Sequence, residues 1–121
     1  MSNPVVWFEI YVQDMERARR FYETVLAIRL EKLESPGMEM WSFAARQDGF
    51  GAGGSLVKMQ GVPSGGSTLV YFGCKDCAVE QARVKGAGGR IDKPKFSIGQ
   101  YGFIALAVDT EGNMFGLHSM Q

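Results

Sequence analysis

The sequence predicts an α+β fold in which two tandem βαβββ units form curved mixed sheets around a cavity. The order strand, aspartate, helix occurs twice, and Asp14 and Asp76 lie 62 residues apart. Segments with the two-residue period of strands outnumber helical ones, and 16 glycines in 121 residues indicate many turns between short strands. We therefore expect one domain, with residues 1–61 and 62–121 as its two units.

The first unit begins with a strand at residues 5–12, which is rich in β-branched and aromatic residues. Asp14 is a favourable N-cap residue. It precedes an amphipathic helix whose apolar side chains recur at helical spacing: Met15, Ala18, Phe21, Tyr22 and Val25. Further strands are expected at residues 28–34, 38–45 and 55–59, with turns at 35–37 and 47–54.

The second unit repeats this order after a break at residues 62–67, which contains a proline and two glycines. A strand at 68–74 leads to Asp76, which again precedes a helix, here residues 77–85. Strands are expected at 90–92, 101–108 and 114–119, with a turn at 109–113. Because only two helices serve about eight strands, a doubly wound parallel sheet is disfavoured.

The charge balance and the short apolar runs limit the function classes. Lys plus Arg and Asp plus Glu each number 13, so neither nucleic acid nor an anionic membrane is an expected partner. No apolar run approaches the roughly 20 residues that span a bilayer. The N-terminus leads into an apolar run without the basic region and the cleavage site of a signal peptide, so we expect a cytoplasmic protein.

Three segments resemble the vicinal oxygen chelate superfamily, which includes glyoxalase I, bleomycin-resistance proteins and extradiol dioxygenases. They are residues 7–18 followed by Phe21-Tyr22, residues 70–72 leading to Asp76 and Gly88-Gly89, and residues 109–117. The similarity covers essentially the whole chain. Within the superfamily, the chain most resembles small single-domain proteins related to lactoylglutathione lyase. It implies the paired βαβββ fold, whereas the activity within that fold has to be argued from the site.

The resemblance also implies four metal-binding positions inside the cavity, which family members usually fill with His and Glu. In this chain the four positions are Trp7, Ser55, Leu69 and Gly116. None of them offers an imidazole or a carboxylate, and a divalent ion needs three or four such donors in fixed geometry. We therefore expect no metal and no other cofactor.

Strand alternation in such a fold determines which side chains face the cavity. Phe8, Ile10 and Val12 are expected to pack under the first helix, so their neighbours on the strand face inward. The expected ligand-binding residues are Trp7, Glu9, Tyr11, Tyr71, Met114 and His118. Aromatic groups with a few polar ones are typical of a site for a small hydrophobic or aromatic molecule.

Glu9 is the most informative of these residues, because a carboxylate among Trp7 and Tyr11 is expected to be partly desolvated. It is either a general base, an anchor for a cationic or hydroxyl-bearing ligand, or the structural partner of an arginine. His118 is either a proton shuttle, a ligand donor or a residue of the rim. The two tyrosines and Trp7 either contact the ligand or belong to the packing.

Cys74 and Cys77 lie at a junction between strand and helix, as the cysteines of thioredoxin-like proteins do. Strand alternation, however, places Cys74 under the helix, and the surrounding βαβ pattern is missing. A zinc site would need two further ligands that the chain lacks. A redox function is therefore disfavoured.

The leading hypothesis is a metal-independent small-molecule binding protein of the glyoxalase and bleomycin-resistance type, which sequesters or senses its ligand. The alternative is an enzyme, a lyase or isomerase related to lactoylglutathione lyase, in which Glu9 is the general base. A redox or purely structural protein is a weaker third class. A homodimer is expected, because assembly removes exposed sheet edges.

Overall fold

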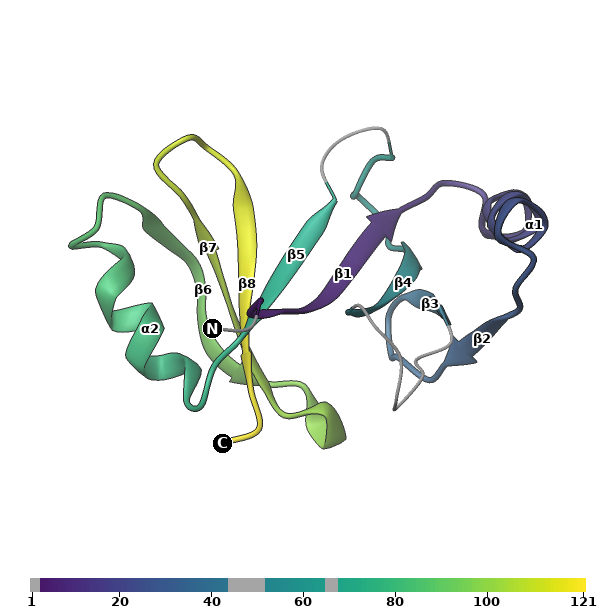
Figure 1. The fold of residues 1–121 in the computed structure, drawn as a ribbon. Coiled ribbons are helices and arrows are strands. Elements are labelled where there is room, and N and C mark those ends of the chain that lie inside the picture. Colours follow the sequence, from purple (N-terminus) through teal and green to yellow (C-terminus); the bar gives the residue numbers. More distant parts are fainter. Residues whose placement is uncertain (1–2, 44–51, 65–67) are drawn as a thin grey trace. The chain divides into compact units, whose positions relative to one another are not determined.

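The computed structural model describes residues 3–43, 52–64 and 68–121. These ranges contain two α-helices and eight strands, so the predicted α+β class is confirmed. The chain forms two compact units (Figure 1): unit 1 is Met1–Val6 with Leu69–Gln121, and unit 2 is Trp7–Thr68. That the two units act as one domain stays a prediction.

Unit 2 has the predicted βαβββ order. Its elements are β1 (Val5–Tyr11, which belongs to unit 2 from Trp7 on), α1 (Met15–Leu26), β2 (Leu30–Leu33), β3 (Glu39–Phe43) and β4 (Gly53–Lys58). The strands lie in the order β2-β3-β4-β1. β1 and β4 are parallel, whereas β3 is antiparallel to both β2 and β4. This is a mixed sheet with one helix.

Unit 1 repeats the same topology. Its elements are β5 (Leu69–Gly73), α2 (Cys77–Val84), β6 (Arg90–Ser97), β7 (Phe103–Val108) and β8 (Met114–Ser119), with a short 3₁₀ turn at Gly99–Tyr101. The strands lie in the order β6-β7-β8-β5. β5 and β8 are parallel, and β7 is antiparallel to β6 and β8. Each unit therefore joins its first strand to its last by parallel pairing.

Helix α1 packs on one face of the unit 2 sheet. The Asp14 carboxylate accepts a hydrogen bond from the backbone N–H of Arg17 at 3.0 Å, which is the predicted N-cap. The buried centre of this contact consists of Val12, Met15, Leu30 and Leu56, and six partly buried side chains pack against it: Ile10, Ala18, Tyr22, Ile28, Trp41 and Phe43. Of the apolar side chains predicted at helical spacing, Met15, Ala18 and Tyr22 take part in this core, whereas Phe21 and Val25 are mostly exposed.

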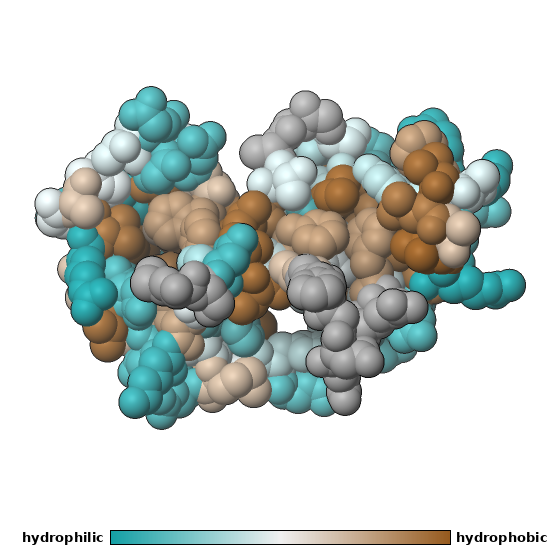
Figure 2. Space-filling model, viewed as in Figure 1, coloured by the Kyte–Doolittle hydropathy of each residue, from teal (hydrophilic) through white to brown (hydrophobic). Residues whose placement is uncertain are grey.

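The C-terminal half of α1 exposes apolar side chains. Phe21, Val25 and Leu26 are each more than half exposed, and Figure 2 shows hydrophobic residues gathered near this helix. Exposed apolar patches of this kind are found where proteins bind other proteins. The expected homodimer stays a prediction.

Helix α2 packs on the unit 1 sheet in the same way. Cys77, Ala105 and Leu117 form its buried centre, with Phe72, Cys74, Phe103 and Phe115 packed against them. The predicted position of Cys74 under the helix is thus confirmed. Both cysteines are free, and burial, assisted by the nearby Glu80, raises the pKa of Cys74 to about 11. A thiol held in this protonated form is a poor nucleophile, which argues against redox function.

Several element boundaries differ from the sequence prediction, and the differences in β6, β7 and β4 have a clear context. β6 continues to Ser97 instead of ending at Asp92, because an edge strand tolerates Pro94 and its pairing with β7 contains irregular steps. β7 begins at Phe103, since the preceding residues form the 3₁₀ turn. β4 includes Gly53 and Gly54, which were expected in a turn; the rest of that turn up to residue 51 lies outside the described residues.

No helix in the described part of the chain is long and apolar enough to cross a membrane. The cytoplasmic location stays a prediction.

Asp76 provides a test of the electrostatics in unit 1. Its carboxylate accepts hydrogen bonds from Lys95 Nζ at 2.8 Å and from the backbone N–H of Ala78 at 3.0 Å. These bonds lower the pKa of Asp76, the bond from Lys95 contributing most. A lowered folded-state pKa stabilises the protein above the unfolded-state pKa of about 4, and this contribution is lost as the pH falls through the folded-state value.

We therefore expect Asp76→Asn to flatten the acid side of the stability curve. The free energy of unfolding of the wild type, measured with urea, should fall more steeply below about pH 4 than that of the variant. Lys95→Met should reproduce much of the flattening, because it removes the largest cause of the lowered pKa. Parallel acid limbs for all three proteins would contradict the assignment.

Candidate ligand-binding site

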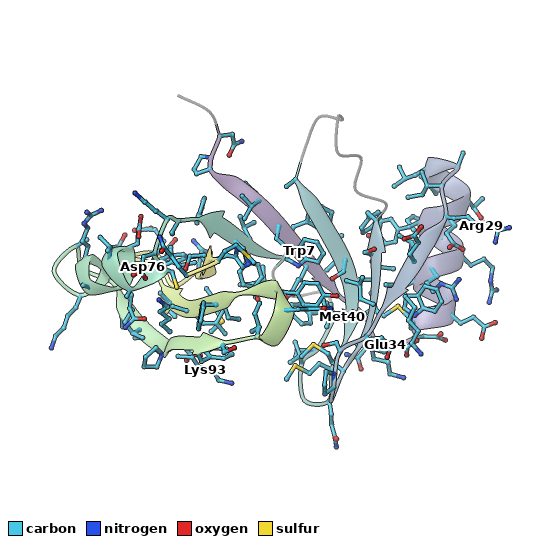
Figure 3. All side chains as sticks on the ribbon, turned by 90° about the horizontal axis from the view of Figure 1, so that it is seen from below. Trp7, Arg29, Glu34, Met40, Asp76 and Lys93 are labelled. Carbon is cyan, nitrogen blue, oxygen red and sulfur yellow. The ribbon has the colours of Figure 1, made fainter. Side chains whose placement is uncertain are left out.

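The face of the unit 2 sheet that points away from α1 is called here the inner face of unit 2. Residues directly opposite each other in neighbouring strands share a face, so the register aligns Glu9 with Ser55 and Ser42, and Tyr11 with Val57 and Met40. In Figure 3, Trp7 and Met40 lie on the side of this sheet away from α1. The alternation expected for β1 is therefore observed.

Glu9 is the centre of a hydrogen-bonded row on this face. Tyr11 donates its hydroxyl to Glu9 Oε1 at 2.8 Å, and the Trp7 indole donates Nε1–H to Glu9 Oε2 at 3.3 Å. Only 9% of Glu9 is exposed. Residues two apart on a strand point the same way, which is why a Trp-x-Glu-x-Tyr pattern on one strand can form this row. The carboxylate is thus oriented by neutral donors on both oxygens.

Tyr11 is held in its protonated form by these surroundings. Burial raises the pKa of its phenol, and the neighbouring Glu9 carboxylate raises it further. A phenol that stays protonated is a permanent donor to Glu9 and can still accept a hydrogen bond from another group. The row therefore presents a fixed arrangement of one carboxylate and one hydroxyl beside an indole.

Ser55 lies next to this row on β4. It is fully buried, and its Oγ has no hydrogen-bond partner among the described residues. Most buried polar atoms have a partner, so an unpaired hydroxyl beside a carboxylate is a feature that calls for an explanation. Ser55 shares the inner face with Glu9, its register partner.

The inner face of unit 1, which points away from α2, carries the other predicted site residues. Tyr71 is the register partner of Gly116, and its ring lies directly over that glycine. His118 Nε2 donates to the carbonyl oxygen of Tyr101 at 2.6 Å, because a carbonyl can only accept. Met114, at the start of β8, is 37% exposed. The structure thus brings Tyr71 against β8 but ties His118 to a turn.

Comparisons with known proteins support the predicted fold. A family model described as bleomycin resistance protein-like N-terminal matches residues 5–40, which include the Trp-x-Glu-x-Tyr strand and α1. Methylmalonyl-CoA epimerase from Streptomyces coelicolor, in complex with 2-nitronate-propionyl-CoA, superposes with a TM-score of 0.69 at 17% identity over 95% of this chain and 92% of that chain. The chain has the vicinal oxygen chelate fold.

Two further structures share this vicinal oxygen chelate fold. Methylmalonyl-CoA epimerase from Mycobacterium tuberculosis matches with a TM-score of 0.69 at 15% identity, over 98% of this chain and 88% of that chain. A protein described as NAD-dependent benzaldehyde dehydrogenase from Legionella pneumophila matches with a TM-score of 0.62 at 17% identity, over 95% and 98%. A sequence comparison with curated proteins finds no match. At these identities the likeness concerns the fold.

The metal positions of vicinal oxygen chelate proteins do not fit a metal in this chain. A Cβ atom at Gly116 would lie 2.1 Å from the Tyr71 ring, and one at Gly53, opposite Trp7, would lie 3.1 Å from the indole. Aromatic rings thus fill space that a longer donor side chain would need. Within the described ranges, no three His, Cys, Asp or Glu side chains are grouped as metal ligands.

Sequence analysis missed part of the inner face of unit 2. Met40, Ser42 and Val57 share it with Glu9, but their side depends on the register of β3 and β4, which a single sequence does not show. A hollow in unit 1 is lined by the start of β6, the end of β7 and the turns beside them, and none of the predicted site residues lines it. It adds nothing to the candidate site.

The contact between Tyr71 and Gly116 yields a stability prediction. Gly116→Ala places a methyl group inside the present position of the ring and should lower the free energy of unfolding by about 1–3 kcal/mol. The same substitution in a Tyr71→Ala background should cost much less, because the clashing ring is gone. Urea unfolding of the two single variants and the double variant measures this coupling.

Gly86→Ala is the matched control, because a Cβ atom there would meet only the Arg83 carbonyl oxygen at an ordinary 3.8 Å. Its free energy of unfolding should stay within about 0.5 kcal/mol of the wild type. Additive costs of Gly116→Ala and Tyr71→Ala would contradict the contact.

Proposed function

We propose that the protein binds a small hydrophobic or aromatic molecule without a metal ion, and that the inner face of unit 2 supplies the polar anchor. The observation that carries this proposal is the row of Trp7, Glu9 and Tyr11, in which a nearly buried carboxylate is oriented by two neutral donors. Aromatic walls with a few oriented polar groups are typical of small-molecule sites.

The cost of burying polar groups supports a functional role for this row. Burying a carboxylate lowers the stability of the fold unless its hydrogen bonds are satisfied. An apolar residue of similar size at the same position would not carry this cost. Local rules of stability are broken most often at functional sites. Glu9 together with Ser55 breaks them on one face of one sheet, which favours ligand recognition over packing.

Unit 1 has an inner face of its own with three residues that we assign to ligand contacts within that unit: Tyr71, Met114 and His118. The ring of Tyr71 is seated on Gly116. His118 donates its Nε2–H to the Tyr101 carbonyl oxygen, so Nδ1 is the other ring nitrogen that a ligand could meet.

An enzyme is the second candidate function, and the structural neighbours favour it. Two of them are described as methylmalonyl-CoA epimerases. In this chain Glu9 would be the general base of a lyase or isomerase, since it is the nearly buried carboxylate of the inner face. Turnover of a bound ligand that Glu9→Gln abolishes while binding persists would favour the enzyme.

The lack of suitable donor side chains at the four expected metal positions predicts the metal content. We expect purified protein to contain far less than one Zn, Ni, Mn or Fe per chain, because Trp7, Ser55, Leu69 and Gly116 replace the usual donors. Elemental analysis after dialysis against metal-containing buffer measures this directly. A stoichiometric metal that chelator removes with a loss of thermal stability would contradict the proposal.

Glu9→Gln tests the anchor. The amide keeps the volume but removes the charge, so the affinity for a ligand found by thermal-shift screening should fall by about 1–3 kcal/mol. Isothermal titration with that ligand gives the affinity of each variant.

Glu39→Gln is the matched control for this measurement. Glu39 also accepts an indole N–H two residues away, from Trp41 at 3.0 Å, but Trp41 packs against the core under α1. Glu39→Gln should therefore leave the affinity for the ligand unchanged. Equal affinities of the wild type and Glu9→Gln, with a lower melting temperature for the latter, would instead make Glu9 a structural residue.

A further inference from the structure

Two buried serines, Ser55 and Ser119, differ in their hydrogen bonding. Ser119, on the helix side of the unit 1 sheet, accepts a hydrogen bond from the Cys77 N–H at 3.0 Å and donates one to the Gln121 carbonyl oxygen at 2.8 Å. Ser55, on the inner face of unit 2, is at least as buried, yet its Oγ has no partner in the described part of the chain. Ser119 is explained by its structural bonds, whereas Ser55 is not.

The surroundings of Ser55 indicate what kind of group it is suited to meet. Its register partner is Glu9, a carboxylate that only accepts hydrogen bonds and whose two oxygens can accept about four in total. A serine hydroxyl carries one proton to donate and lone pairs to accept with. A ligand hydroxyl suits both neighbours at once, because it can donate to the carboxylate and accept from the unpaired serine hydroxyl.

We propose that Ser55 is a specificity-determining residue that, together with Glu9, recognises a hydroxyl group on an aromatic ligand. This inference rests on the proposed function and names its ligand class. The aromatic body of the ligand lies against Trp7, which is the indole next to Glu9 on the same face. The unpaired serine hydroxyl lowers the stability of the ligand-free protein and is satisfied when the ligand is bound.

Access to Ser55 requires a side chain to move, because the serine is fully buried. Trp7 is the side chain we assign to this movement. Its N–H···O bond to Glu9 is 3.3 Å long, which is longer and weaker than the 3.0 Å bond of the same kind between Trp41 and Glu39. Trp7 fluorescence therefore reports on the ligand. The other tryptophan, Trp41, packs on the helix side of the sheet.

The experiment measures binding by fluorescence in a Trp41→Phe background, where Trp7 is the single tryptophan. Phenol and toluene are the probes, because they share a ring and differ by a hydroxyl in place of a methyl group. Benzylamine tests a cation instead. We expect phenol to bind about tenfold more tightly than toluene, and Ser55→Ala to remove most of this difference while leaving toluene unaffected.

Thermal unfolding supplies the second readout. Ser55→Ala should melt at the same temperature as the parent or higher, since no partner is left unpaired. Ser119→Ala, the control, should melt lower by about 4 °C or more, because it orphans the Cys77 N–H. A lower melting temperature for Ser55→Ala would show a structural hydroxyl and overturn the inference.

The binding outcomes separate this inference from the proposed function. Equal affinities for phenol and toluene, an equal loss of both in Ser55→Ala, or tighter binding of benzylamine than of phenol would overturn the inference. A screening ligand that depends on Glu9 but lacks a hydroxyl and ignores Ser55→Ala would leave the proposed function standing alone. If no probe and no screening ligand binds, both fall.

Discussion

The parallel pairing of β1 with β4 places Glu9 opposite Ser55 and Ile10 opposite Leu56, and the rest of unit 2 depends on this register. Since side chains alternate along a strand, a slip of one residue would exchange the core under α1 for the polar row. Ile10 and Leu56 belong to that core, whereas Glu9 and Ser55 lie on the other face. The apolar contact with the helix therefore fixes the positions of the polar groups, although it does not touch them.

The second constraint on the structure is that an aromatic ring on one strand needs a glycine opposite it on the next. Both units contain such a pair. Trp7 lies over Gly53 in unit 2, and Tyr71 lies over Gly116 in unit 1, each pair being register partners across the parallel strands. A ring can lie flat on the sheet only where its neighbour has no side chain. This device explains why glycines occur inside strands β4 and β8. At Gly116 it also leaves no space for a donor side chain, because the Tyr71 ring fills the position.

The sequence was sufficient to predict the fold because its signals are local. Asp14 and Asp76 mark the helix starts, and the period of each strand identifies the side chains that pack beneath each helix. The row of Trp7, Glu9 and Tyr11 could be predicted for the same reason, since all three residues belong to one strand. Ser42 and Met40 could not, because their side of the sheet depends on pairing between strands separated along the chain. The extension of β6 through Pro94 was missed since propensity alone indicates a loop there.

Unit 2 contains the same pair of residue types twice, and the contrast indicates what the inner face is built for. Trp41 and Glu39 on β3 form a 3.0 Å hydrogen bond. The guanidinium of Arg19, a residue of α1, lies 3.5 Å above the indole, so the helix packs over this pair. Trp7 and Glu9 form a longer bond of 3.3 Å on the face of the sheet that points away from α1. A tryptophan fixed by a cation stabilises the packing of a helix. Trp7, with its longer bond, lies instead beside an oriented carboxylate and an unpaired hydroxyl, and this contrast is what supports the proposed ligand recognition on the inner face of unit 2.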